Sequence, residues 1–371
     1  MDDKKSGNLP EAGKDITKAD GLTRRAAIAT IAAVAGAPAV AADVAANTVL
    51  KSPNSPFGPS DETTHPAGPD SIWQESYWIY FGNGKGLGGV VHTGEQVNLG
   101  KSNIFALGYA DGLAFRRAKD DHDLNRDARA SGRFSAGEYI FTPGTDGRVY
   151  LSGKDEGFAL DLEFIPQTKS LRWLTVFPNP ENHVGSQTSS YNIQTPGVVR
   201  GTMRLGDKLF DVDAFSQRGH SWGNRDYKAL RGNGSRWVTG SVGDRLNFSA
   251  YVAIRADGMV IKSGFVVDRG EVRHTSDINV TVEVDFDSVT YRAGVVRMKF
   301  PDREYVFRAK IDNINLIQHH GSEINVGGGD LRVDGLSETG YSAWEINERP
   351  PTPAGGVPFS FGSLVVDGLK K

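Results

Sequence analysis

Short runs in which apolar and polar residues alternate recur along this chain, and they constrain its fold more than any other feature. From Leu246 to Ile254 every second residue is apolar, and the same period of two returns from Val280 to Phe286. Period two places one set of side chains on each face of a β-strand. Asp-Gly pairs, which favour tight hairpin turns, stand at 111–112, 146–147, 257–258, 334–335 and 367–368. The sequence therefore predicts a mostly β protein, closed as a sandwich or barrel to protect its sheet edges.

Two segments allow other interpretations. The charged segment Ala114–Asp127 is typical of a short helix or a mobile loop. Residues Gly84–Gly89 match the glycine spacing of a dinucleotide-binding loop, but such a loop must open a helix, whereas Val90–His92 continues as a strand. We therefore expect a glycine-rich hairpin turn at this position.

The first 42 residues resemble an export signal. The pair Arg24-Arg25 precedes an apolar, alanine-rich run that begins at Ala26, and Ala39-Val40-Ala41 offers small residues to a signal peptidase. Twin arginines before a weakly apolar run are similar to a twin-arginine translocation signal. Ala27 stands where that signal usually has phenylalanine, so ordinary secretion and a retained anchor stay open as alternatives. We expect a periplasmic or secreted protein that uses the twin-arginine export machinery as a partner.

Composition excludes several kinds of function. The chain has no cysteine, which excludes disulfides, thiolate metal sites and a cysteine nucleophile. A net charge of -3 without a basic cluster argues against nucleic-acid binding. No run after the signal approaches the roughly 20 apolar residues of a membrane span, so we expect no stable membrane insertion.

Histidine spacing indicates no metal site. The neighbours His319 and His320 diverge if they lie on a strand, so a zinc site would need histidines to converge from distant strands. We expect neither a metal nor a cofactor.

We divide the chain into four parts. Residues 1–42 form the export signal, and 43–71, rich in Pro, Ser and Thr, form a flexible linker or arm. Two β-domains follow at 72–200 and 201–371, each long enough for a barrel of about eight strands.

Residues suited to proton transfer gather between Phe215 and Tyr227. This stretch holds His220, Trp222 and Asp226 together with two arginines. Imidazole transfers protons near neutral pH, and an indole face stabilises a cation or covers an apolar ligand. These residues are candidates for catalysis, although a packed structural turn uses the same residue types.

Several stretches resemble landmarks of the carotenoid 1,2-hydratase and AttH-like group. They are Trp-Gln-Glu-Ser-Tyr-Trp at 73–78, Gly-Leu-Gly-Gly at 86–89, Tyr191 with Gln194, Arg-Gly-His-Ser-Trp-Gly-Asn-Arg-Asp-Tyr at 218–227, and Gly340-Tyr341 with Glu345. The resemblance covers most of the chain after the signal. It implies two lipocalin-like antiparallel β-barrel or sandwich domains in tandem, with few short helices and the histidine motif near their junction.

The resemblance also implies a lyase or isomerase of the hydratase-dehydratase type. Its substrate would be a hydrophobic terpenoid, steroid or prenylated aromatic compound with a reactive C=C bond. Relatives usually carry an aspartate directly before the histidine, where this chain has Gly219. The proton donor would then be His220, Asp226 or Glu345, and Trp222 would face the carbocation. The expected substrate-binding residues are Tyr77, Tyr191, Gln194, Tyr227 and Trp237.

Two other functions stay open. A carrier of hydrophobic small molecules would need an aromatic lining but no acid, which suits the glycine before His220. A carbohydrate-active protein would suit the export signal and the tryptophans, but no pair of carboxylates stands at an informative spacing.

Overall fold

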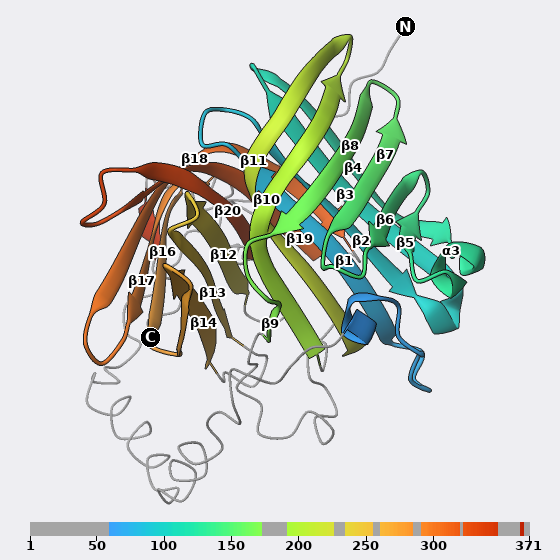
Figure 1. Ribbon diagram of the computed structural model, residues 1–371, viewed down its shortest axis with the longest axis horizontal. Coiled ribbons are helices and arrows are strands. Elements are labelled where there is room, and N and C mark those ends of the chain that lie inside the picture. The colour runs from blue at the N-terminus through green and yellow to red at the C-terminus, as the bar shows by residue number, and fades with distance from the viewer. Residues whose placement is uncertain are drawn as a thin grey trace, which may run out of the picture. The chain divides into compact units, whose positions relative to one another are not determined.

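Two antiparallel sheets, one after the other along the chain, make up most of the structure (Figure 1). The structure is a computed structural model that describes residues 59–172, 191–225, 234–254, 260–284, 291–319, 322–347 and 364–366. The prediction of a nearly all-β protein with two barrel-like sheets in tandem is confirmed.

The first sheet brings the N-terminal strand beside the histidine motif. Within the described residues its strand order is β4-β3-β2-β1-β11-β10-β8-β7-β6-β5, with β9 alongside β10, and β5 also contacts β2. Its strands are β1 (Trp73–Gly82), β2 (Gly88–Gln96), β3 (Lys101–Ala110), β4 (Leu113–Asp123), β5 (Phe134–Ala136), β6 (Tyr139–Pro143), β7 (Val149–Asp155), β8 (Phe158–Pro166), β9 (Leu171–Arg172), β10 (Tyr191–Leu205) and β11 (Lys208–Asn224). The pairing of β1 with β11 joins residues that lie far apart in the sequence.

The second sheet repeats this plan. Its order within the described residues is β15-β14-β13-β12-β20-β19-β18-β17-β16-β21. Its strands are β12 (Ser235–Val242), β13 (Leu246–Ile254), β14 (Val260–Asp268), β15 (Glu271–Thr275), β16 (Ile278–Val284), β17 (Tyr291–Lys299), β18 (Glu304–His319), β19 (Ser322–Val333), β20 (Thr339–Asn347) and β21 (Leu364–Val366). The alternating run Leu246–Ile254 forms β13, and the described part of the second run, 280–284, lies in β16.

Turn chemistry agrees with the sequence. Asp111 and Gly112 have φ values of 51° and 74°, and they close the β3–β4 hairpin between the paired residues Ala110 and Leu113. Left-handed backbone at both central residues matches the right-handed twist of the flanking strands. The glycine-rich segment 84–89 likewise forms the β1–β2 hairpin, as expected, and opens no helix.

The charged segment Ala114–Asp127 is neither a helix nor a loop for most of its length. It forms strand β4, which ends at Asp123, and the short helix α3 (Arg126–Ala130) follows. Strand β4 lies at one end of the strand order and most of its side chains are exposed. An edge strand needs no apolar alternation, and charges on it prevent pairing with other chains.

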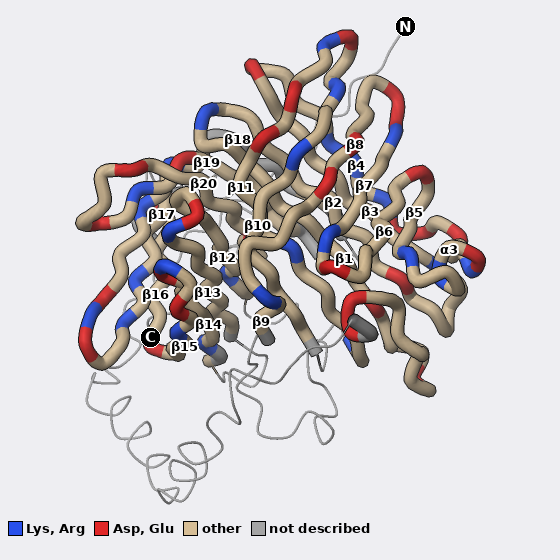
Figure 2. The backbone as a smooth tube through the Cα atoms, viewed as in Figure 1, with Lys and Arg blue, Asp and Glu red and all other residues tan. Residues whose placement is uncertain are grey.

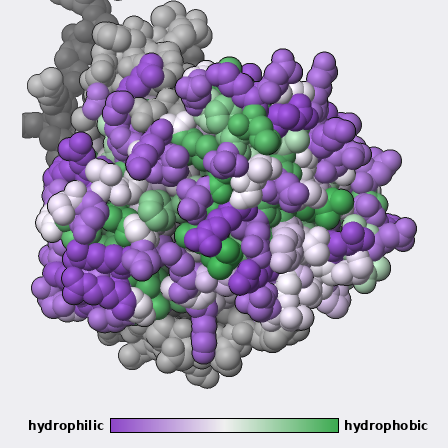
Figure 3. All heavy atoms as spheres, turned by 45° about the horizontal axis from the view of Figure 1, so that its top comes forward, coloured by the Kyte–Doolittle hydropathy of each residue, from purple (hydrophilic) through white to green (hydrophobic). Residues whose placement is uncertain are grey.

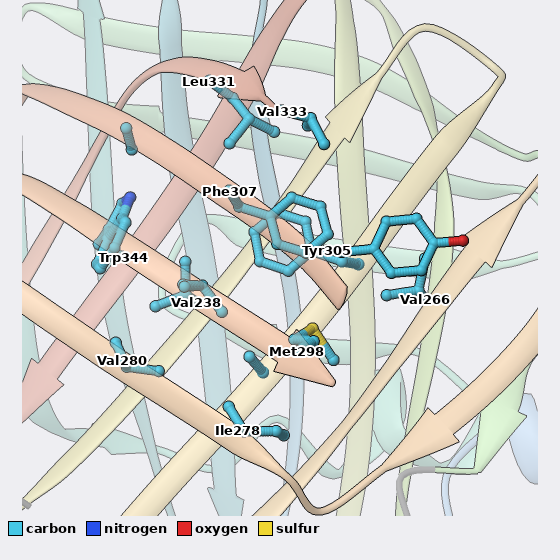
Figure 4. Packing of buried hydrophobic residues seen from close by; sticks show 14 of the residues in the cluster. Val238, Val266, Ile278, Val280, Met298, Tyr305, Phe307, Leu331, Val333 and Trp344 are labelled. Carbon is cyan, nitrogen blue, oxygen red and sulfur yellow. The ribbon is translucent and has the colours of Figure 1, made fainter. Parts of the chain in front are cut away.

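Each sheet encloses its own apolar core. The second sheet packs Val238, Val280 and Met298 around the stacked rings of Phe248 and Phe307, whose centroids lie 3.8 Å apart (Figure 4). A corresponding cluster lies inside the first sheet. Lysines, arginines and carboxylates lie largely toward the hairpin ends and outer strands (Figure 2), and the face in Figure 3 is mostly hydrophilic with smaller hydrophobic patches.

The division between the sheets differs from the one expected at 200/201. Residue 201 lies inside β10, which pairs with β11 along its whole length, and the second sheet begins only at Ser235. One long hairpin therefore keeps the histidine motif in the first sheet. The described part of the expected linker 43–71, from residue 59 onward, is not a free arm, because η1 (Pro59–Glu62) and the residues after it contact buried side chains of the first sheet.

Helices are few in the described part of the chain. Besides η1 and α3, there is one 3-10 turn, η2 (Val97–Leu99). None of the helices described here has the length and apolar character that a membrane crossing needs.

Candidate functional site

Strand β1 is buried on both faces, so it contributes side chains to two separate clusters. All ten residues from Trp73 to Gly82 are buried. Tyr77 lies in the core cluster of the first sheet, whereas Trp78 and Tyr80 pack with Trp237 of the second sheet. Alternation along the strand therefore assigns odd-numbered residues to an inner cluster and even-numbered residues to an inter-sheet cluster.

The inner cluster centres on His220, which is fully buried. In the pairing of β11 with β1, Tyr77 is the residue opposite His220. The His220 Nδ1 lies 2.9 Å from the carbonyl oxygen of Asp61, and Nε2 lies 2.9 Å from Oε1 of Glu75. Burial lowers the pKa of His220, and its contact with Glu75 opposes this effect.

Glu75 is the acidic neighbour of His220. Burial opposes its ionisation, but hydrogen bonds from His220 and His65, with the charge of Arg129, lower its pKa to about 2. The Nδ1 atom of His65 lies 2.6 Å from Glu75 Oε1, and the His65 ring stacks on Trp222 with centroids 3.8 Å apart. His65, which comes after η1 in the chain, is thus part of the same cluster as Glu75 and His220.

One arginine serves two buried carboxylates here. Arg129 Nη1 lies 2.8 Å from Glu75 and 2.5 Å from Glu95. Burial raises the pKa of Glu95 to about 7, against the opposing charge of Arg129. The hydrogen bonds from the two histidines therefore keep Glu75 ionised, whereas burial leaves Glu95 largely protonated below pH 7.

Replacing Glu95 by Gln is expected to reduce the pH dependence of folding stability. The carboxyl of Glu95 has an ordinary pKa of 4.5 and a folded pKa of about 7. As pH rises through this window the unfolded chain loses its proton first, so the wild type loses about 3 kcal/mol of stability between pH 5 and 8. Urea unfolding of both proteins at the two pH values measures the difference. A wild type that becomes more stable relative to the variant at pH 8 would contradict it.

Arg218 anchors η1 to the inner face. It is fully buried and donates to both carboxylate oxygens of Glu62, with Nη2 3.0 Å from Oε1. The same guanidinium donates to Tyr77 at 2.8 Å, to Ser170 at 3.0 Å and to Thr195 at 2.7 Å. Although burial opposes ionisation of Glu62, the charge of Arg218 lowers the pKa of this carboxyl.

The inter-sheet cluster combines aromatic rings with one carboxylate. The ring of Trp237 lies 4.9 Å from those of Trp78 and Tyr80. Tyr80 donates a hydrogen bond of 3.0 Å to Oε2 of Glu345, which is the cross-strand partner of Trp237. Burial and the Glu345 carboxylate raise the pKa of Tyr80 well above its usual value, so its hydroxyl stays protonated and donates. Glu345 is partly exposed, whereas the rings of Tyr80 and Trp237 beside it are buried.

The amide side chains of Gln194 and Gln217 lie on the face of the first sheet that also carries Tyr80. Gln217 Nε2 donates to Gln194 Oε1 at 3.3 Å, which leaves Gln194 Nε2 and Gln217 Oε1 without partners among the described residues. Both side chains are at most 3% exposed, so the orphan donor and acceptor are not solvated by bulk water. Buried amide groups without partners are costly, and a polar ligand group would satisfy them.

Gly219 lies on this face as well, and Trp78 fills the space that a side chain would need. A Cβ at Gly219 would lie 1.9 Å from Cζ2 of Trp78. A side chain at position 219 would therefore collide with the indole of Trp78.

Replacing Gly219 by Ala is expected to destabilise the protein by about 1–3 kcal/mol, because the new methyl group overpacks a rigid indole. The double variant with Trp78→Phe lacks the clashing atoms and should recover part of this loss. Thermal and urea unfolding of the three proteins test it. A Gly219→Ala variant as stable as the wild type would show that the indole moves freely.

The structure places the sequence candidates in two groups. His220, Trp222 and Tyr77 belong to the inner cluster, and Glu345 and Trp237 belong to the inter-sheet cluster. Glu345 is therefore not the acidic partner of His220. Gln194 lies in the first sheet opposite Gly219 and contacts Gln217. For Tyr191 the structure gives the backbone, paired with Trp222 in β10–β11, and Asp226 and Tyr227 lie outside the described residues.

Sequence reasoning missed Glu75, His65 and Arg129 in the inner cluster and Tyr80 as the partner of Glu345. Glu75 carried a usable signal, because a carboxylate between aromatic residues in a strand, two positions before Tyr77, must point to the same face as that tyrosine. Nothing in the local sequence around His65 or Arg129 marks either residue.

Comparison with solved structures supports the fold. A candidate AttH protein from Nitrosomonas europaea aligns with a TM-score of 0.57 at 17% identity, covering 76% of this chain and 94% of its own. Kievitone hydratase from Nectria haematococca aligns with a TM-score of 0.52 at 12% identity, covering 79% and 98%. CghA with Sch210972 aligns with a TM-score of 0.50 at 11% identity, covering 79% and 96%. The resemblance to the AttH-like group is thus confirmed at the level of the fold.

Sequence comparison assigns the family. A search of the curated proteins gave no match. The family model described as a domain of unknown function matches residues 58–350, which include both sheets up to the end of β20. The chain therefore belongs to the family described as domain of unknown function DUF7064.

Proposed function

We propose that the protein is a lyase or isomerase of the hydratase-dehydratase type, acting on a C=C bond of a hydrophobic terpenoid, steroid or prenylated aromatic compound. The observation that carries the proposal is the Tyr80–Glu345 hydrogen bond beside the rings of Trp78 and Trp237. It combines a carboxyl group, a proton donor and aromatic faces at one place. The similarity of the fold to kievitone hydratase supports the same class by analogy.

The chemistry follows from these groups. In its protonated form Glu345 transfers a proton to one alkene carbon, which leaves a tertiary carbocation on the other. The indole faces of Trp78 and Trp237 stabilise this cation by about 1–2 kcal/mol per desolvated contact. A water molecule then adds to the cation and returns a proton to the Glu345 carboxylate, so that one water is added overall. Loss of a neighbouring proton instead of water addition gives an isomer.

Tyr80 positions the carboxyl group by donating to one of its oxygens. The orphan amide atoms of Gln194 and Gln217 offer one donor and one acceptor to a hydroxyl or carbonyl group of the substrate. The inner cluster has no place in this reaction, because His220 is fully buried on the other face of the strand pair.

Incubation with a panel of terpenoid, steroid and prenylated phenolic compounds in ¹⁸O-labelled water tests the proposal. Label is expected in a product made by the wild type. Ligand-dependent quenching of tryptophan fluorescence without any new product would instead favour the alternative of a non-catalytic carrier.

Action in the periplasm or outside the cell stays a prediction, because the export signal at 1–42 lies outside the described residues. Cell fractionation checks it, and a wholly cytoplasmic protein would contradict it.

A further inference from the structure

We propose that His65, Glu75 and His220 bind a divalent transition-metal ion inside the first sheet. One ligand atom from each side chain lies within 4.8 Å of the others. The site comes from three places in the fold: the segment after η1, strand β1 and strand β11. Two imidazoles and one carboxylate form a donor set typical of zinc and its first-row neighbours.

The two ring nitrogens of His220 face different groups. Nδ1 lies 2.9 Å from the carbonyl oxygen of Asp61, and Nε2 lies 2.9 Å from Oε1 of Glu75. Because the carbonyl orients the ring through Nδ1, Nε2 is the nitrogen that would coordinate an ion shared with Glu75.

The distances suit this arrangement. Glu75 Oε1 lies 2.9 Å from His220 Nε2 and 2.6 Å from His65 Nδ1. Ligand atoms on one tetrahedral zinc ion stand about 3.3 Å apart, given metal–ligand bonds of roughly 2.0–2.1 Å. Each histidine nitrogen therefore needs to move less than about 1 Å away from Glu75 Oε1, and all three ligand atoms lie within 4.8 Å of one another.

Hydrogen bonds and ring stacking from neighbouring groups already orient the three proposed ligand side chains. The Asp61 carbonyl fixes the His220 ring, and Arg129 holds the second oxygen of Glu75 at 2.8 Å. Trp222 stacks on His65, whose Nε2 points toward Oδ1 of Asp61 at 3.9 Å. A metal-bound histidine commonly turns its other nitrogen to a carbonyl or carboxylate in this way.

The ion would act as a structural clip. Glu75 and His220 are fully buried, and His65 reaches them from outside the strands. Binding would therefore attach the segment after η1 to β1 and β11. This role is separate from the reaction proposed at Glu345, because Glu345 contacts Tyr80 on the opposite face of β1. Either proposal can therefore fail without the other.

Metal analysis of protein prepared without a histidine tag tests the inference. Protein stripped with a chelator and titrated with Zn²⁺ is expected to bind one ion per chain in calorimetry and to show a higher Tm with the ion. With Co²⁺ it should give the visible absorption of a protein-bound ion of low coordination number.

The discriminating variant is His65→Ala, because His65 lies outside the sheet and its loss should leave the fold intact. We expect it to weaken Zn²⁺ binding at least about 100-fold, more than loss of an orienting partner usually does. His122→Ala on the edge strand β4 is the matched control and should bind as the wild type does. Folded wild type that binds no Zn²⁺ or Co²⁺ at micromolar concentrations, or a His65→Ala variant that binds like the wild type, would overturn the proposal.

Discussion

Replacing Glu345 by Gln is expected to lower the rate of product formation by about 100- to 10,000-fold, the usual contribution of a general acid-base group. Gln keeps the size of the side chain and an oxygen that accepts from Tyr80, but it cannot transfer a proton. The folded structure should therefore be unaffected. Rates of ¹⁸O incorporation, measured on the substrate that the panel identifies, give the comparison directly.

Two further variants locate the effect. Glu338→Gln changes an exposed carboxylate just before the same strand and should leave the rate unchanged. Tyr80→Phe removes the group that positions Glu345, so it should lower the rate by a smaller factor and shift the pH–rate profile. A Glu345→Gln variant that retains full activity would remove Glu345 from the mechanism.

Replacing Arg218 by Met is expected to lower the free energy of unfolding by about 3–5 kcal/mol, because it leaves a buried carboxylate without its counter-charge. The guanidinium is fully buried and serves Glu62, Tyr77, Ser170 and Thr195 at once. Methionine fills much of the volume but donates to none of these groups. Urea-induced unfolding followed by fluorescence measures the loss.

Matched variants separate the buried ion pair from a general effect of losing charge. Arg308 makes a two-pronged contact with Asp334, at 2.9 and 3.0 Å, but both side chains are about half exposed. Arg308→Met should therefore cost no more than about 1 kcal/mol. Adding Glu62→Gln to Arg218→Met should restore part of the stability, since the unpaired charge is gone. Equal losses in Arg218→Met and Arg308→Met would contradict the interpretation.

Sequence patterns were a good guide to the strands and turns that carry a local signal. Strand β13 follows the alternation of its apolar residues, and Asp111-Gly112 forms the expected hairpin turn. Both features are local, because side-chain period and turn conformation depend on a few neighbouring residues. The charged edge strand β4 lacked this signal, since most of its side chains are exposed to solvent.

The two clusters could not be read from the sequence in the same way. Strand β1 shows no apolar–polar alternation because both of its faces are covered, one by the first core and one by the second sheet. Which face of β1 packs against the first core and which against the second sheet depends on contacts between distant segments of the chain. The histidine motif was found, but its sequence could not indicate which acidic residue lies beside His220 in space.

Sequence alone determined the fold class, the resemblance to the AttH-like group and the presence of His220, Trp222 and Glu345 among the informative residues. Only the tertiary structure decided their partners: Glu75 beside His220 at a separation of 145 positions, and Tyr80 beside Glu345 at 265. The physical reason is that strand parity is set locally, whereas contacts between strands are set by sheet order and by what covers each face.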